Sequence, residues 1–293
     1  MQIMNIIIFG QTGQVALELQ RIAALQNVTL TALPRAVADL GDPDACATLI
    51  ASTDADIIIN AAAYTAVDQA ETDETTATCV NATAPGAMAR AAAARGIPFL
   101  HVSTDYVFDG SGATPWAEDA PTAPLGAYGR SKLAGEAQIT AAGGPHAILR
   151  TAWVFSAHGN NFVKTMLRLA QTRDGISVVA DQFGGPTSAR AIAQALLTLA
   201  TAFHRGQGTS GIFHFAGAPT VSWAEFATRI FSLADIVRKP TITPIPSSQY
   251  PTPAARPMNS SLNCHKIKRV YGIEQPDWVT ELTDVLAELD QKS

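Results

Sequence analysis

Short apolar stretches alternate along the chain with longer segments of helical periodicity. Buried strands are predicted at Met4–Phe9, Val28–Leu33, Asp56–Asn60, Pro98–Ser103 and Ala147–Arg150. Helices are predicted between them at Gln14–Ala24, Pro43–Ala51, Glu74–Arg95 and Gly129–Ala141. Strands that alternate with helices form parallel sheets, because each helix carries the chain back across one face of the sheet. The pattern therefore predicts an α/β fold with a doubly wound parallel sheet.

The pattern changes after about residue 151, where the loops become longer and prolines cluster in residues 239–257. Further strands are predicted at Ile176–Ala180 and Ile212–Ala216, and further helices at Phe162–Arg173, Ser188–Phe203 and Ser222–Leu233. We expect a larger domain over residues 1–155, to which the elements near residues 186–218 return. A smaller C-terminal lobe, mainly residues 156–293, is expected to close its loops over a ligand.

The composition excludes several classes of protein. Of 293 residues, 47% are hydrophobic and 15% are charged, which is typical of a globular protein with a large core. The net charge of −5, without a long basic run, argues against nucleic acid or an acidic membrane as a partner. Cys46, Cys79 and Cys264 form no CxxC pair, which indicates a reducing cytoplasm. The chain shows no signal peptide and no apolar run of roughly 18 residues, so a cytoplasmic protein is expected.

A glycine-rich segment, Gly10-Gln11-Thr12-Gly13-Gln14-Val15-Ala16, follows the first predicted strand and opens the first helix. Gly10 permits a tight turn, and Gly13 lets the backbone approach a diphosphate at the positive end of the helix. Such a segment also occurs as a turn without a ligand. Its place directly after the first strand favours a dinucleotide, and it predicts a Rossmann-type dinucleotide-binding domain over residues 1–155.

The end of the second predicted strand bears on the choice of cofactor. An acidic residue is expected there in a protein that binds the ribose 2′-hydroxyl of NADH, but this chain has Leu33-Pro34-Arg35. Arg35 fits a 2′-phosphate and favours NADPH, although a solvated surface arginine is an equal alternative and NADH stays open. Asp39 and Leu40 are candidates for the border of the adenine site.

Tyr128 and Lys132 have the YxxxK spacing, which places both side chains on one face of a helix. An ammonium group beside a phenol favours the phenolate and is expected to lower the pKa of Tyr128, so that this residue can act as a general acid in carbonyl reduction. The same spacing also occurs by chance at the start of surface helices. Thr104, at the end of the fourth predicted strand, is a candidate third catalytic group that holds the substrate oxygen.

These motifs together resemble the extended short-chain dehydrogenases that process nucleotide sugars, and within them the dTDP-4-dehydrorhamnose reductase family. The resemblance covers nearly the whole chain. Its motifs are Phe9–Gln14, Asn60–Asp68, Ser103–Phe108, Tyr128–Glu136, Arg150–Val154, Gly159–Phe162, Asp181–Thr187 and Arg256–Ser260.

The resemblance implies a reaction in which NAD(P)H delivers hydride to C4 of a 4-keto-6-deoxy sugar nucleotide. Tyr128 would protonate the product oxygen, with assistance from Lys132 and Thr104. The residues expected at the cofactor are Gly10, Gln11, Thr12, Gly13, Gln14, Val15, Arg35, Asp39, Leu40, Ala61, Ala62, Ala63, Tyr64, Thr65, Tyr128 and Lys132. Those expected at the dTDP-sugar are Thr104, Asp105, Val67, Asp68, Trp153, Asn161 and Arg256.

Members of this family also include proteins with a magnesium site at a dimer interface. Glu18 would supply one ligand here, but Arg190 stands where a second acid is expected, so magnesium is doubtful. A homodimer stays open, with Glu18 and Arg190 paired as ions in place of the metal.

Three alternative functions stay open at this point. A sugar 4,6-dehydratase would need a further acid where this chain has Tyr106, and a 4-epimerase favours the acidic ribose reader that is absent here. A non-catalytic sugar-nucleotide or NADP-binding regulatory subunit of the same fold could dispense with Thr104, Tyr128 and Lys132, all of which are present. Simple reduction is favoured over each of these alternatives.

Overall fold

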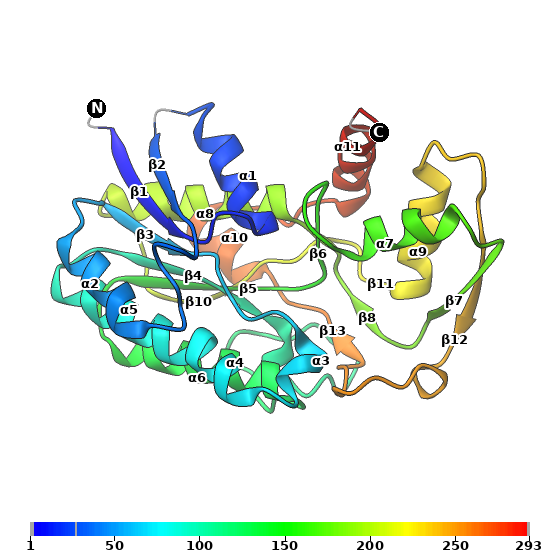
Figure 1. Ribbon diagram of the computed structural model, residues 1–293, viewed down its shortest axis with the longest axis horizontal. Helices are drawn as coiled ribbons and strands as arrows, with labels where there is room; N and C mark the ends of the chain where they lie inside the picture. Colours follow the sequence, from blue (N-terminus) through cyan, green and yellow to red (C-terminus); the bar gives the residue numbers. More distant parts are fainter. Residues whose placement is uncertain (1–2, 27, 292–293) are drawn as a thin grey trace.

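A computed structural model of the chain describes residues 3–26 and 28–291. Six strands form its central sheet, in the order β10-β5-β4-β3-β1-β2 (Figure 1). They are β1 Met4–Phe9, β2 Val28–Leu33, β3 Ile57–Asn60, β4 Phe99–Thr104, β5 His146–Thr151 and β10 Gly211–His214. Every neighbouring pair in this sheet is parallel. The five strands predicted within residues 1–155 therefore form one parallel sheet with β10, whereas the predicted strand Ile176–Ala180 (β7, Gly175–Val179) lies in a separate two-stranded sheet.

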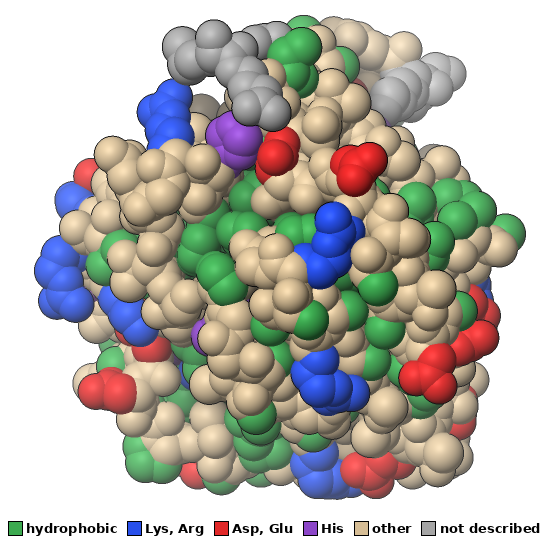
Figure 2. Space-filling model, turned by 90° about the vertical axis from the view of Figure 1, so that its left-hand side faces the viewer, with side chains coloured by type: hydrophobic (Ala, Val, Ile, Leu, Met, Phe, Trp, Pro, Cys, Tyr) green, Lys and Arg blue, Asp and Glu red, His purple; other side chains and the backbone are tan. Residues whose placement is uncertain are grey.

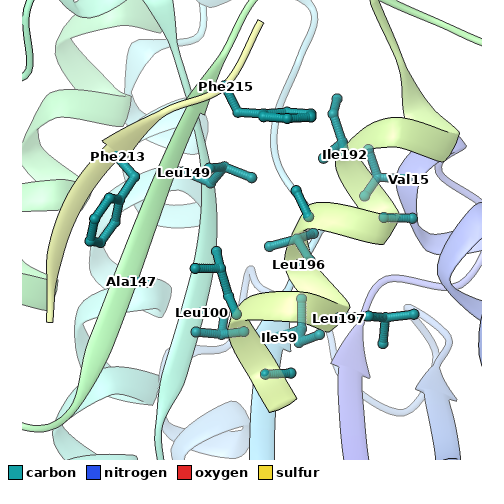
Figure 3. Packing of buried hydrophobic residues seen from close by; sticks show 14 of the residues in the cluster. Val15, Ile59, Leu100, Ala147, Leu149, Ile192, Leu196, Leu197, Phe213 and Phe215 are labelled. Atoms are coloured by element: carbon teal, nitrogen blue, oxygen red, sulfur yellow. The ribbon is translucent and has the colours of Figure 1, made fainter. Parts of the chain in front are cut away.

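Helices cover both faces of the sheet. Ile57 and Ile59 belong to an apolar cluster with α1 (Gln14–Ala23) and α8 (Ala189–His204), whereas Ile58 belongs to a second cluster with α2 (Pro43–Ser52) and α5 (Ala84–Ala94). This division arises because successive side chains of a strand point to opposite faces. Figure 3 shows side chains of α8 in the first cluster beside those of β3, β4 and β5. The predicted doubly wound α/β fold is confirmed.

The order of the strands creates an opening at the carboxyl end of β1. β2 lies on one side of β1 and β3 lies on the other. The connections that leave β1 and β3 therefore run in opposite directions, and ligands of open α/β sheets bind in the crevice between such connections. The glycine-rich loop occupies this place, since it joins β1 to α1.

A second group of elements lies beside the carboxyl ends of the strands (Figure 1). It has an apolar cluster of its own, formed by residues of α7, α9, α11 and β7. These elements are α7 Phe162–Ala170, β7 Gly175–Val179, α9 Trp223–Leu233, β12 Thr241–Ile245 and α11 Trp278–Asp290. Two elements from the same half of the chain belong with the central sheet instead. β10 is one of its strands, and α8 packs in the apolar cluster on one of its faces. The domain boundary at residue 155 stays a prediction.

The predicted helix over Glu74–Arg95 is divided in the structure. It consists of α4 (Glu74–Thr78), a π-helical turn over Cys79–Thr83 and α5. Pro85 has no N–H with which to continue the regular hydrogen-bond ladder, and a π turn accommodates this interruption. The proline-rich segment contains a strand, β12, that the hydrophobic pattern did not predict. Pro244 is tolerated in β12 because this strand pairs only with β7.

The remaining elements are the long helix α6 and several short ones. They are α3 Val67–Ala70, α6 Ala127–Ala141, α10 His265–Tyr271, β6 Val154–Phe155, β8 Phe183–Gly184, β9 Thr187–Ser188, β11 Val221–Ser222, β13 Asn259–Ser260 and 3₁₀ turns at Asp105–Val107 and Ser247–Gln249. No helix within the described ranges has both the length and the apolar character that a membrane span requires. On the face drawn in Figure 2, acidic and basic side chains are interspersed with wide neutral surface.

Candidate active site

A cavity of about 940 Å³ opens at the carboxyl ends of the central strands. Most of the residues predicted from the sequence line it: Gly10–Val15, Arg35, Asp39, Leu40, Ala61–Thr65, Val67, Thr104, Asp105, Tyr128, Lys132 and Trp153. Three predicted residues, Asp68, Asn161 and Arg256, are not in its lining. The structure thus brings both ends of the predicted site, the glycine loop and the tyrosine–lysine pair, to one cavity.

The glycine loop has the geometry that its composition predicts. Gly10 has a φ of +109°, and a Cβ atom there would lie 3.3 Å from the backbone nitrogen of Ala62. Gly13 is the N-cap of α1, and no side chain of the described residues caps this helix end. The first amide groups of α1 therefore remain available to an anion at the positive end of the helix.

Arg35 and Asp39 form an exposed ion pair at the far end of the cavity. Arg35 Nε lies 3.2 Å from Asp39 Oδ2, and the Arg35 side chain is 84% exposed. The Gly41 amide donates to Asp39 Oδ1 and, together with Arg35, lowers the pKa of Asp39. A carboxylate therefore does stand at this end of the cavity, six residues beyond β2. Hydrophobic periodicity could not show that the loop brings it to Arg35.

Tyr128 lies in the first turn of α6 and faces the cavity. Burial raises its pKa well above the usual range, while the contact with the Thr104 hydroxyl partly opposes this rise. The expected lowering of this pKa by Lys132 is wrong for this structure, because Lys132 has other partners. Its Nζ lies 2.7 Å from the Val102 carbonyl and 2.9 Å from His101 Nε2. Tyr128 is therefore a neutral phenol, the form that a proton donor requires.

Lys132 is almost fully buried, and burial lowers its pKa to about 8. His101 is fully buried beside it on β4, and its other ring nitrogen lies 3.1 Å from Asn60 Nδ2. Sequence reasoning missed His101 as a partner of Lys132 and Asn60 as a partner of His101. The only signal was a histidine within an otherwise apolar strand, three residues before Thr104.

Thr104 and Asp105 form a second polar group on the cavity wall. Thr104 Oγ1 lies 3.1 Å from Asp105 Oδ1 and accepts a hydrogen bond from the Tyr106 amide. Burial raises the pKa of Asp105 to about 6, against hydrogen bonds from Ser260 and Thr104. Asp105 Oδ2 is buried and has no hydrogen-bond partner among the described residues. A ligand that donates a hydrogen bond would satisfy this atom.

Trp153 belongs to the cavity lining, and Arg256 lies outside it. Trp153 lines it with a φ of +50° and stacks on Trp223 at a centroid distance of 3.5 Å. Arg256 Nη2 lies 2.8 Å from Asp68 Oδ2, so these two predicted residues contact one another behind the lining. Arg256 Nη1 is buried and has no partner within the described chain. Arg256 thus keeps an unused donor.

Asn161 has a structural contact that the sequence did not reveal. Its Nδ2 lies 2.9 Å from Gln14 Oε1, and its Oδ1 caps α7 by accepting from the Lys164 amide. Gln14 is also bonded by Ser156. Asn161 therefore ties the glycine loop to α7 and stands outside the cavity lining.

The geometry can now be compared with known proteins. The family model described as the RmlD substrate binding domain matches residues 4–291. The chain belongs to the RmlD family. The match covers the glycine loop, the tyrosine–lysine pair and the C-terminal elements alike.

Similar proteins of the RmlD family are named dTDP-4-dehydrorhamnose reductase. One from Sinorhizobium fredii is 45% identical, and the match covers 94% of each chain. A crystal structure from Clostridium acetobutylicum has a TM-score of 0.91 at 34% identity, with 98% of this chain and 100% of that chain covered. One from Bacillus anthracis, solved in complex with NADP, has a TM-score of 0.91 at 33% identity and the same coverage. The resemblance deduced from the motifs is confirmed.

The magnesium site suggested for the RmlD family does not fit the residues of this chain. Glu18 is buried, and its carboxylate lies 2.7 Å from Arg21 and 3.2 Å from His158. Arg190 pairs with Asp284 at 3.1 Å, so within the chain it is not the partner of Glu18. The described residues contain no cluster of three side chains suited to a metal ion.

Proposed function

We propose that this chain is an NADPH-dependent reductase that converts dTDP-4-dehydro-L-rhamnose to dTDP-L-rhamnose, for nucleotide-sugar and surface-polysaccharide biosynthesis in the cytoplasm. The observation that carries the proposal is the single cavity with the glycine loop at one end and Tyr128, Lys132 and Thr104 at the other. The names of the similar reductases support the choice of substrate. The test is oxidation of NADPH by the purified chain, which should require dTDP-4-dehydro-L-rhamnose.

The residues at the glycine-loop end fit a dinucleotide. The free amide groups at the start of α1 suit the diphosphate, and the absence of a side chain at Gly13 leaves room for it. When bound, NADPH would supply the hydride for C4 of the sugar. Lys132 and Tyr128 lie at the end of the cavity where the nicotinamide ribose is expected.

Tyr128 would donate its phenolic proton to the keto oxygen at C4, which becomes an alkoxide as hydride adds to C4. The raised pKa keeps this proton in place at neutral pH until the oxygen becomes basic. Thr104 would hold the same oxygen by a hydrogen bond. Asp105, with its unpartnered Oδ2, would accept a hydrogen bond from a sugar hydroxyl, and Trp153 would bound the sugar site.

The C-terminal lobe, mainly residues 156–293, would bind the nucleotide part of the substrate. Arg256 is our candidate for the diphosphate of the sugar nucleotide, because a guanidinium group with an unused donor forms hydrogen bonds with phosphate oxygens. Val67 and Asp68, which pairs with Arg256, would border the same region. Asn161 would hold the glycine loop in position through its hydrogen bond with Gln14.

We expect a modest preference for NADPH over NADH. Arg35 is exposed and shares its guanidinium with Asp39, so its attraction for a 2′-phosphate is weakened by solvent and by the carboxylate. Arg35→Ser should lower kcat/KM for NADPH by about tenfold or less and leave that for NADH nearly unchanged. Asp39→Asn, which frees Arg35, should increase the preference. Steady-state kinetics with both cofactors measure this, and a wild-type preference for NADH would refute the role of Arg35.

A homodimer of this chain, if it forms, should not depend on a divalent metal. The carboxylate of Glu18 is already engaged by Arg21 and His158, and the Arg21 guanidinium adds a positive charge beside any cation placed there. Light scattering in magnesium and then in excess EDTA should give the same molecular mass and the same activity. Loss of both on chelation, with recovery on addition of magnesium, would contradict this expectation.

A further inference from the structure

Asn60, His101 and Lys132 form a buried chain of hydrogen bonds that no step of the proposed reaction yet uses. The exposed fractions are 0% for Asn60, 0% for His101 and 1% for Lys132. His101 Nδ1 lies 3.1 Å from Asn60 Nδ2, and His101 Nε2 lies 2.9 Å from Lys132 Nζ. Both ring nitrogens therefore face nitrogen atoms. The position of each proton in this chain can be deduced from what each atom is able to donate or accept.

The backbone fixes the orientation of the Asn60 amide. The Ala62 N–H donates to Asn60 Oδ1 at 3.1 Å. A backbone N–H can only donate, so the oxygen of the side-chain amide must face Ala62 and its NH₂ group must face His101. His101 Nδ1 must therefore accept a hydrogen bond and carries no proton. This step does not depend on how the two ends of the amide were assigned.

The proton of the His101 ring then lies on Nε2, towards Lys132. Burial lowers the pKa of His101 well below its usual value, so the ring is neutral and has one N–H. An Nε2–H group needs a lone pair as its acceptor. The ammonium form of lysine has three N–H groups and no lone pair, whereas the neutral amine has one. The neutral amine can accept from His101 and still donate to the Val102 carbonyl at 2.7 Å.

We propose that His101 is a positioning residue that stabilises the neutral amine of Lys132 relative to the ammonium, with Asn60 fixing the tautomer of the ring. The inference rests on the proposed catalytic role of Lys132 and adds a control of its charge. Lys132 also lines the cavity. When Nζ takes up a proton from solvent, it loses the lone pair that held it to His101. The charged form is then favoured on the cavity side, towards the groups that transfer protons.

The surrounding charges agree with a titration of Lys132 near neutral pH. The charged groups on α6 and on the elements packed against it are Asp68, Glu74, Arg90, Asp105, Arg130, Glu136 and Arg150. Glu136 raises the pKa of Lys132, but burial is the larger effect and lowers it to about 8. Glu136 is itself bound by Arg150 at 2.6 Å, which weakens its attraction for Lys132. The Lys132 amine can therefore change its charge near pH 8.

The tautomer of His101 is the most direct readout and needs no activity. The chain has six histidines, and ¹⁵N NMR of the histidine-labelled protein reports which ring nitrogen of each carries a proton. The resonances of His101 are those that disappear in His101→Gln. We expect a protonated Nε2 and a bare Nδ1. A protonated Nδ1 in the wild-type protein would overturn the proposal, whether or not the protein reduces the keto sugar.

Two variants reverse the donor–acceptor direction of the hydrogen bonds between Asn60, His101 and Lys132. Asn60→Asp replaces the NH₂ group that faces Nδ1 by an oxygen, so the ring proton should move to Nδ1 and Nε2 should accept from the ammonium. His101→Gln can present its carbonyl oxygen to the ammonium at nearly the place of Nε2. In both variants the alkaline limb of kcat/KM with NADPH should move up by about one pH unit.

The controls separate this role from a structural one. Combining Asn60→Asp with His101→Gln removes the ring, so any additional shift measures the direct effect of the carboxylate charge alone. A loss of kcat in the single variants, with the alkaline limb unmoved and the fold intact by circular dichroism, would contradict the proposal. Absence of NADPH oxidation in the wild type would instead contradict the proposed function and leave the tautomer measurement decisive for this inference.

Discussion

Tyr128→Phe should lower kcat roughly 10²–10⁴-fold, the usual contribution of a general acid. The substitution keeps the aromatic ring and its edge-to-face contact with Tyr106 at a centroid distance of 5.5 Å, but it removes the proton that the C4 oxygen would receive. Binding of NADPH should change little, because the glycine loop and Lys132 are untouched. Single-turnover kinetics and a fluorescence titration with NADPH measure the two effects separately.

The matched control for this prediction is Tyr106→Phe. It removes a phenol from the same part of the cavity wall, but from a residue whose hydroxyl interacts with Arg256. We expect it to raise KM for the sugar nucleotide more than it lowers kcat. Near-normal turnover of Tyr128→Phe would exclude Tyr128 as the proton donor.

Glu136→Gln should destabilise the protein by about 3–5 kcal/mol, because it leaves the charge of Arg150 buried without a counter-charge. The Glu136 and Arg150 side chains are each 2% exposed. Both oxygens of the Glu136 carboxylate accept hydrogen bonds from the Arg150 guanidinium. Nearby His214 cannot replace the lost negative charge, because an imidazole is either neutral or positive, and burial lowers its pKa to about 3 and keeps it neutral. Urea denaturation measures the change in the free energy of unfolding.

Two comparisons control this prediction. Glu74→Gln breaks the ion pair with Arg130, whose partners are each 46% exposed, and should cost less than about 1 kcal/mol. The double variant Glu136→Leu with Arg150→Met removes both buried charges and should recover much of the lost stability. An equal effect of Glu136→Gln and Glu74→Gln would show that burial of the pair does not decide its contribution.

The strands of the central sheet could be predicted from the sequence because parallel strands buried on both faces read as continuous apolar runs. β1 and β2 have the predicted bounds, and the others differ by a residue or two. β12 could not be found in this way. It contains Pro244, and it exists through its pairing with β7, more than sixty residues earlier. The helix α11 was not predicted, although its N-cap, Asp277, is a signal for the start of a helix.

The candidate site shows the same limit. The glycine loop and the YxxxK spacing are local, so their place at the carboxyl ends of the strands followed from the order of the elements. The charge states of Tyr128 and Lys132 could not be predicted in this way. The YxxxK spacing shows which residues are neighbours, but it does not show how deeply they are buried. Burial raises the pKa of Tyr128, and Lys132 bonds to His101 across 31 residues of sequence. The direction predicted for the pKa of Tyr128 was wrong for that reason.

The central claim is that hydride passes from NADPH to C4 of the keto sugar within this cavity. The most direct measurement uses NADPH deuterated at C4 of the nicotinamide, with dTDP-4-dehydro-L-rhamnose as substrate and NMR of the purified product. The account predicts dTDP-L-rhamnose with deuterium at C4 of the sugar and one NADPH oxidised for each product formed. A sugar product without deuterium at C4, or no oxidation of NADPH by correctly folded protein, would contradict it.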